Sequence, residues 1–294
     1  MNNNEETRAC TLAFGAVALW STVAVAFKLA LKEIAPLDLV ILAVSVSWLS
    51  LGVVLLIRGN RKPESVVSLR TVFYSALLGL INPLLYYWML FAAYSRLPAQ
   101  VAQPLNYTWP LFLALLAVPV AGKRPTVRDI LGLFISLTGV VLIAGRPGSI
   151  SDQLDPGGIV LALGSGVIWA FSWLMGTRLR MEGTLRLFIG FTAALVVLIV
   201  SRAGKGIRVP SGIPGWGAVI WVGLFEMGIT FLLWNGALKR TRRPARIGNL
   251  VYLGPFISLL WIYLILGESI RPATVAGLGI IISGILIGRG GTAE

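Results

Sequence analysis

The chain repeats the stretch Leu105-Asn106-Tyr107-Thr108-Trp109-Pro110 after 145 residues, as Leu250-Val251-Tyr252-Leu253-Gly254-Pro255. Leucine, tyrosine and proline return at matching places, and both stretches lie inside long apolar segments. A proline inside a helix removes a hydrogen-bond donor and frees a carbonyl, and lipid cannot satisfy such groups. We therefore predict two helices broken at Pro110 and Pro255, facing a cavity. Paired breaks in two halves of one chain point to a ligand site within a membrane.

The composition is that of a protein embedded in a lipid bilayer. The 294 residues are 56% hydrophobic and 13% charged, with mean hydropathy +0.84, whereas a soluble domain carries roughly 25% charged residues. The net charge of +13 would suggest nucleic acid in a soluble protein. Here the cations lie in short loops between apolar segments, so we expect a bilayer and no nucleic acid as partner.

The residue inventory argues against an enzyme. Histidine is absent, which excludes histidine metal sites and histidine proton relays, and the single cysteine, Cys10, excludes an internal disulfide. No P-loop is present, so ATP is not the expected energy source. Several polar groups gathered at one interface, as a lipid-modifying enzyme needs, are also missing. We expect no metal and no cofactor.

A membrane span needs about 20 mostly apolar residues, and the sequence predicts ten such helices in an all-α membrane protein. Lysine and arginine mark the cytoplasmic side, and 17 of the 25 fall on one side if the N-terminus is cytoplasmic. We predict a bacterial inner-membrane protein with both termini in the cytoplasm. The predicted spans are 9–31, 37–57, 71–93, 99–121, 127–145, 157–177, 184–201, 215–237, 246–266 and 273–289.

Glycines extend the repeat over two halves, 1–150 and 151–294. At the same offset of 145 residues, Gly122, Gly132 and Gly139 correspond to Gly267, Gly277 and Gly284. Each half holds five predicted spans, and because five is odd the second half enters the membrane from the opposite side. An inverted repeat of this kind predicts a central cavity and alternating access.

Similar turns follow the fourth and ninth spans: Gly-Lys-Arg-Pro at 122–125 and Gly-Glu-Ser-Ile-Arg-Pro at 267–272. Together with the ten spans and the two halves, they give a resemblance to a known family over the whole chain. The chain resembles the drug/metabolite transporter superfamily in its EamA-type branch, although Lys123 replaces the usual acidic residue. The stretch 106–110 is similar to the aromatic amino acid exporters of that branch. The resemblance implies a secondary-active transporter that exports Phe, Tyr and Trp across the inner membrane. The alternative is a broad-range exporter of drugs, organic cations or other metabolites on the same fold.

Aromatic and polar residues at mid-depth are the candidates for the cavity wall. Trp20 and Trp169 correspond in the repeat and Trp109 adjoins a break, although helix packing explains any one of them equally well. Trp48 has no strong counterpart, so we expect it to pack or to face lipid. Polar residues at depth are costly and are functional candidates. The predicted substrate-binding residues are Trp20, Asn82, Tyr86, Asn106, Tyr107, Trp109, Trp169, Trp173 and Tyr252.

Three further features of the sequence lead to predictions: a buried acidic residue, a lysine at a span end and a glycine motif. Glu226 is the only acidic residue in the middle of a predicted span, and it carries a coupling proton or is a neutral, hydrogen-bonded group. Lys28, near the end of the first span, is expected to reach the outer headgroups, and the alternative is that it attracts a substrate carboxylate. Gly284 and Gly288 form a GxxxG motif, which favours packing within a monomer over a homodimer.

Overall fold

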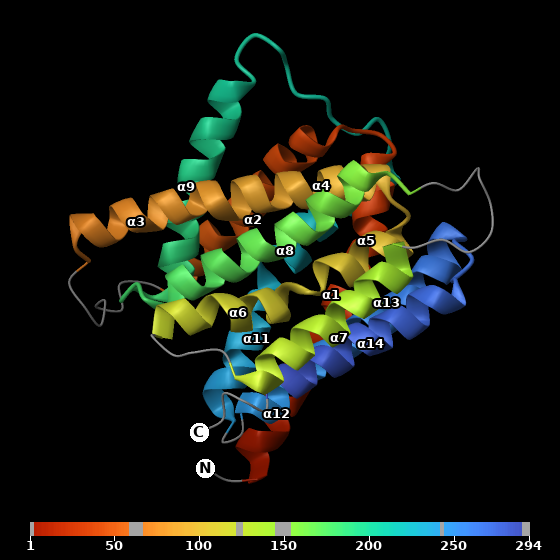
Figure 1. Ribbon diagram of the computed structural model, residues 1–294. Helices are drawn as coiled ribbons and strands as arrows, with labels where there is room; N and C mark the ends of the chain where they lie inside the picture. Colours follow the sequence, from red (N-terminus) through yellow and green to blue (C-terminus); the bar gives the residue numbers. More distant parts are fainter. Residues whose placement is uncertain (1–2, 59–66, 122–125, 145–153, 242–243, 290–294) are drawn as a thin grey trace.

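The computed structural model describes residues 3–58, 67–121, 126–144, 154–241 and 244–289. All regular elements within these ranges are helical, and the described chain has no strand (Figure 1). The turn at 122–125 and the predicted boundary between residues 150 and 151 lie outside the described residues. Eight helical segments are long and apolar enough to cross a membrane: Glu5–Leu31, Pro36–Ile57, Leu69–Arg96, Val127–Ala144, Pro156–Thr177, Gly183–Ser201, Ile213–Arg240 and Ile247–Leu266.

The other two predicted spans are also helical but are shorter or interrupted. The segment 99–121 consists of α5 (Ala99–Asn106) and α6 (Trp109–Ala121), separated by a turn at Tyr107 and Thr108. The last predicted span corresponds to α14 (Pro272–Arg289). Its apolar part, Pro272–Gly288, is shorter than the eight segments above. The interruption lies directly before Trp109 and Pro110, where the sequence predicts a break.

Five of the long segments are continuous helices, and three are composite. The continuous ones are α1 (Asn3–Leu31), α2 (Pro36–Arg58), α7 (Val127–Ala144), α8 (Pro156–Thr177) and α9 (Gly183–Ser201). The composite ones are α3 (Leu69–Gly79), η1 (Leu80–Leu85) and α4 (Tyr86–Arg96); α10 (Ile213–Trp221), η2 (Val222–Glu226) and α11 (Ile229–Arg240); and α12 (Pro244–Asn249), η3 (Leu250–Tyr252), α13 (Leu253–Trp261) and η4 (Ile262–Leu266).

Two helix breaks were not predicted from the sequence. Asn82 has φ −145° and ψ 110° inside the π-helical turn η1, because the residue before a proline, here Pro83, avoids helical dihedrals. Gly228, between η2 and α11, has φ −124° and ψ −95°. The third and eighth predicted spans are therefore interrupted near their middles, as the fourth is. The ninth stays helical through the 3₁₀ turn η3 into α13, so the predicted break at Pro255 was wrong.

The helices α7 and α14 lie side by side and touch backbone to backbone (Figure 1). A Cβ atom on Gly139 would lie 2.5 Å from the Gly277 carbonyl oxygen, and one on Gly132 would lie 2.5 Å from that of Gly284. Only glycine permits this approach. Residue numbers rise along α7 from Gly132 to Gly139 while those of the contacted residues on α14 fall from Gly284 to Gly277. The two helices are therefore antiparallel. Gly288 also lies against Gly132, so the GxxxG motif packs within the chain.

The remaining helices pack around α1 and α8. α1 packs against α11 and α13, and α8 packs against α4 and α6, while α9 contacts both α2 and α3. Small buried residues of α1, such as Ala13 and Ala16, let neighbouring helices approach closely. The outer faces are apolar and exposed, with Leu56 81% and Phe134 63% accessible. Lipid would cover such faces.

Candidate functional site

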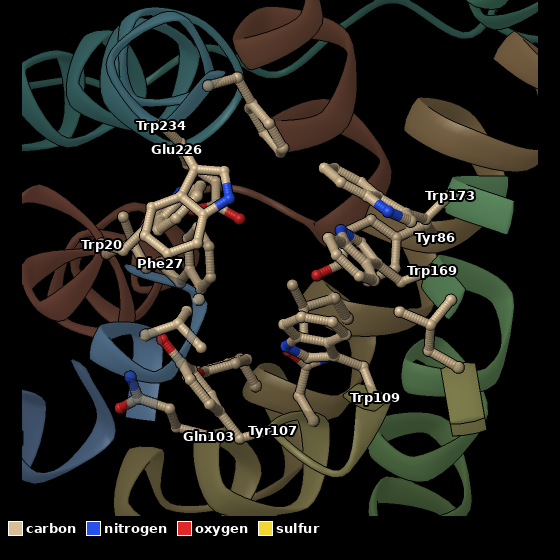
Figure 2. Close-up of a pocket in the computed structure, with 18 of the residues that line it drawn as sticks. Trp20, Phe27, Tyr86, Gln103, Tyr107, Trp109, Trp169, Trp173, Glu226 and Trp234 are labelled. Atoms are coloured by element: carbon tan, nitrogen blue, oxygen red, sulfur yellow. The ribbon is translucent and has the colours of Figure 1, made fainter. Parts of the chain in front are cut away.

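A cavity of about 210 Å³ lies between the two halves of the chain (Figure 2). It is bounded by α1, α4, α8 and α11, by the segments on either side of the Tyr107 break, and by the η2 and η3 turns. Its lining comprises Trp20, Val23, Phe27, Tyr86, Leu90, Tyr94, Gln103, Asn106, Tyr107, Trp109, Leu113, Trp169, Trp173, Glu226, Phe231, Trp234, Leu238, Gly248 and Val251.

Three tryptophans form one wall of this cavity. Trp169 and Trp173 are one helical turn apart on α8 and therefore share a face, with ring centroids 5.1 Å apart and planes 14° from parallel. Trp109 begins α6 directly after the break, and its ring centroid lies 4.0 Å from that of Trp169. The break thus places Trp109 against α8.

A second aromatic group forms the opposite wall, and Figure 2 shows Trp20 and Trp234 across the cavity from Trp169 and Trp173. The Trp20 ring centroid is 5.5 Å from those of Phe231 and Trp234. Phe231 and Trp234 were not among the predicted site residues. Their spacing of three residues on α11 places them on one face, which is the signal that could have identified them.

Polar groups are concentrated near the Tyr107 break. The Asn106 amide nitrogen donates to Ser165 Oγ at 2.9 Å, and Ser258 Oγ donates to Gln103 Oε1 at 2.5 Å. The buried Gln103 Nε2 has no hydrogen-bond partner within the described chain, so it is available to a ligand. Tyr107 lines the same part of the cavity, beside Gln103 (Figure 2). Gln103 precedes Pro104 and is a polar residue at depth, but it was not among the predicted substrate-binding residues.

Glu226 is the only charged residue among the described residues that line this cavity. It closes the π-helical turn η2 and is buried, and the Tyr87 hydroxyl donates to its Oε1 at 3.3 Å. Tyr86 lines this cavity while Tyr87 lines a second one. No group of three or more His, Cys, Asp or Glu side chains in the described part of the chain could hold a metal ion.

The structure brings most of the predicted site residues together and separates two of them. Asn82 lines the second cavity, and its Nδ2 donates to Ser172 Oγ at 3.1 Å. Tyr252 is buried outside the cavity, because the 3₁₀ turn η3, with three residues per turn, directs the neighbouring Val251 inward instead. The predicted residues that do line the first cavity are Trp20, Tyr86, Asn106, Tyr107, Trp109, Trp169, Trp173 and Glu226.

The remaining tryptophan and proline predictions concern structure. Trp48 stacks on Phe188 with ring centroids 5.4 Å apart and donates to Thr192 Oγ1 at 2.9 Å, so it packs as expected. Pro110 and Pro255 are buried in the first turns of α6 and α13 and do not line the cavity.

The second cavity, of about 370 Å³, lies beyond Trp169, Trp173 and Phe231, which line both cavities. Its other walls come from α3, η1, α4, α8, α9, α11 and the turn between η2 and α11. They comprise Ser75, Leu78, Gly79, Asn82, Tyr87, Ser172, Gly176, Thr177, Gly183, Arg186, Leu187, Gly190, Phe191, Met227 and Asn235.

Side-chain hydrogen bonds of Glu268 and Lys28 join helix ends to one another at one end of the bundle. Glu268 accepts from the backbone nitrogens of Ala99 and Gln100 at 2.9 and 3.1 Å, where a carboxylate suits the N-terminus of α5. Lys28 Nζ donates to the carbonyls of Tyr94 and Leu97, each at 2.9 Å. The expectation that Lys28 reaches the headgroups was wrong, because the last carbonyls of α4 need donors.

The model of the EamA-like transporter family matches the chain in two stretches, residues 7–145 and 156–288. The chain is 27% identical over 187 residues to the "Uncharacterized transporter YyaM" of Bacillus subtilis, a match that covers 60% of this chain but only 59% of that protein's length. It is 24% identical over 282 residues to the "Uncharacterized inner membrane transporter YedA" of Escherichia coli, covering 93% and 88% of the two chains. It is also 24% identical to "Protein PecM" of Dickeya dadantii, covering 94% and 90%.

One solved crystal structure superimposes with a TM-score of 0.65 over 96% of both chains at 23% identity, which is a likeness of fold alone. The family match covers nearly the whole chain in two stretches, each corresponding to one half of the predicted repeat. Eight helical segments within the described residues are long and apolar enough to cross a membrane, and the chain is an integral multi-pass membrane protein that belongs to the EamA-like transporter family.

Proposed function

We propose that the chain is a secondary transporter that exports small solutes with an aromatic ring, above all the amino acids Phe, Tyr and Trp. The observation that carries this proposal is the pair of facing aromatic walls, one around Trp169 and one around Trp20. Aromatic rings that stack or meet edge to face gain about 0.5–1.5 kcal/mol beyond the burial of their area. A substrate ring between the walls can contact both.

The cavity's size and its polar groups favour an amino acid over a large drug. Its volume of about 210 Å³ lies below the roughly 300–1,000 Å³ of sites for drug-sized ligands. Gln103 Nε2 and the Tyr107 hydroxyl can donate to a carboxylate, while Glu226 offers an acceptor to an ammonium group. These groups lie beside the aromatic walls.

The packing of the glycine helices supports an inverted repeat of two halves, 1–150 and 151–294, and hence alternating access. In the repeat Gly132 corresponds to Gly277 and Gly139 to Gly284, and the contacts are Gly132 with Gly284 and Gly139 with Gly277. Exchanging the two halves turns the first of these contacts into the second, as expected at a two-fold axis. Ser136 Oγ donates to the Ile281 carbonyl, its own counterpart at offset 145.

The same exchange relates the larger contacts. α1 packs on α11 and α13 as α8 packs on α4 and α6, and each of these pairs maps onto the other when the halves are exchanged. We propose that both termini are cytoplasmic, on the strength of the lysine and arginine distribution. The cavities then communicate with the cytoplasm, and the Glu268 contacts close the outer side.

A second candidate function is export of organic cations. One observation favours it: Glu226 is the only charged group among the described residues lining the first cavity. A cation over an aromatic face gains about 2 kcal/mol when desolvated, and Glu226 would neutralise its charge.

Counterflow into proteoliposomes separates the two functions. We expect purified protein to exchange labelled Phe and Trp faster than Ala, and to exchange a quaternary ammonium dye weakly. Robust uptake of the dye without uptake of Phe or Trp would refute the first function and support the second. Protein-free liposomes provide the background for each label.

A further inference from the structure

Arg186 is the only charged residue among the described residues that line the second cavity. It lies on the first turns of α9 and is partly buried. A guanidinium group inside a cavity wall is costly to desolvate, so it calls for an anionic or polar partner. No acidic side chain lines this cavity within the described residues.

Most of the hydrogen-bonding capacity of Arg186 is unused. One guanidinium nitrogen donates to the Gly176 carbonyl, and a guanidinium has five N–H donors. No described carboxylate forms an ion pair with it. The nearby Glu182 instead accepts from Leu185 N and Thr184 Oγ1, each at 2.8 Å, as the cap of α9. Arg186 therefore presents free donors to the cavity.

Two amides share this cavity with Arg186. Asn235, on α11, makes no hydrogen bond with any described residue although its side chain lines the wall. Asn82 uses Nδ2 to bond Ser172 Oγ. Three aromatic residues, Trp169, Trp173 and Phe231, line both this cavity and the first one. The cavity thus has a cationic, amide-rich side and an aromatic side.

We propose that this second cavity is a carboxylate-binding subsite, in which Arg186, assisted by Asn235, receives the substrate's carboxylate before its ring enters the aromatic cavity. Arginine binds carboxylates through two parallel hydrogen bonds, and an aromatic side chain attached to the same substrate would lie on the shared tryptophan wall. The subsite rests on the proposed transport function and specifies its substrate class: molecules that carry a carboxylate beside an apolar or aromatic body. A simple monocation would gain no affinity from Arg186 and would depend on the aromatic walls alone.

The test compares two substrates that differ by the carboxylate, phenylalanine and phenethylamine, in counterflow. Charge-assisted hydrogen bonds are the strong ones, so we expect Arg186→Gln to raise the KM for phenylalanine about tenfold and to leave that for phenethylamine unchanged or lower. Asn235→Ala removes no bond within the described protein and should raise the phenylalanine KM by a smaller factor, about threefold. Arg180→Gln is the matched control, because Arg180 is exposed on the loop before α9 and lines neither cavity.

The outcomes distinguish the subsite from the proposed function. No counterflow of either substrate by the wild-type protein refutes the function itself. Wild-type counterflow with equal KM changes for both substrates in Arg186→Gln, or with the same change in Arg180→Gln, overturns the subsite. Phenethylamine exchange shows that a variant is folded. If Arg186→Gln transports neither substrate, the subsite is tested with Arg186→Lys and Asn235→Ala instead. The subsite predicts that both variants lose phenylalanine counterflow selectively. An equal loss for phenylalanine and phenethylamine overturns it.

Lipid phosphate is the other source of anionic oxygens for Arg186. The measurements are therefore repeated in vesicles of phosphatidylcholine alone and in vesicles that also contain phosphatidylglycerol. The subsite predicts the same selective rise in the phenylalanine KM in both. A selective effect that appears only with phosphatidylglycerol would show that Arg186 acts on lipid and would overturn the proposal.

Discussion

Replacing Trp109 by alanine tests the aromatic cavity most directly, because Trp109 forms one wall and lies 4.0 Å from Trp169 between ring centroids. A substrate ring on this wall loses a stacking partner, which costs about 1 kcal/mol. It also loses contact with one indole face, roughly 40 Å² of apolar area, which at about 25 cal/mol per Å² is another 1 kcal/mol. The total of about 2 kcal/mol corresponds to a rise of roughly thirtyfold in the KM for Trp or Phe.

The assay is counterflow of labelled Trp into proteoliposomes, with Trp48→Ala as the matched control. Trp48 also stacks on an aromatic ring and donates a hydrogen bond, but it lines neither cavity. Its removal should therefore lower stability while leaving the KM within about twofold. Trp109→Phe keeps a ring and should fall between wild type and Trp109→Ala. Equal KM changes for Trp48→Ala and Trp109→Ala would refute the assignment of the substrate site to this cavity.

Three other predictions test coupling, packing and closure. Glu226→Gln should retain counterflow but lose accumulation driven by a pH gradient, and a variant with normal accumulation and unchanged pH dependence would exclude Glu226 as the coupling group. Gly139→Val must separate two backbones and should abolish the monodisperse folded protein in size-exclusion chromatography, whereas Gly279→Ala on the same interacting pair of helices meets nothing within 4 Å and should elute as wild type. Glu268→Gln weakens two charge-assisted hydrogen bonds, so a cysteine at Leu90, in a chain without other cysteines, should react about tenfold faster with an impermeant thiol reagent added at the closed end; an unchanged rate would show that Glu268 does not hold that end shut.

The sequence contained enough information to predict the helical class and the interruption of the fourth span, because apolar length and proline act locally. It did not reveal the break at Gly228, since a lone glycine in an apolar run is compatible with a continuous helix. It could predict that Trp169 and Trp173 share a face, which follows from helical periodicity. The spacing of Phe231 and Trp234 indicates only that they share a face of α11. It does not show that this face completes the opposite wall, because that depends on how α11 rotates against α1.

The sequence also did not predict the direction of side chains outside regular α-helix or at helix ends. Tyr252 corresponds to Tyr107 in the repeat, so symmetry predicted both in the cavity wall, but the 3₁₀ turn changes which residue faces inward. Lys28 was expected to leave the protein because long cations usually do so. The carbonyls that it contacts, Tyr94 and Leu97, come from another helix end, and no local pattern in the first span records them.

Under the proposed repeat, the two halves must be alike in the scaffold and unlike at the site. The crossing of α7 and α14 is two-fold symmetric because both conformations of an alternating-access protein need it. At the break, however, Trp109 corresponds to Gly254, and a Cβ on Gly254 would lie 2.8 Å from the Tyr107 hydroxyl. The space that a second tryptophan would occupy is thus filled by the tyrosine of the first copy. A second tryptophan at position 254 would collide with Tyr107, so at the two repeated stretches the first copy supplies the aromatic contact and the second copy leaves room for it.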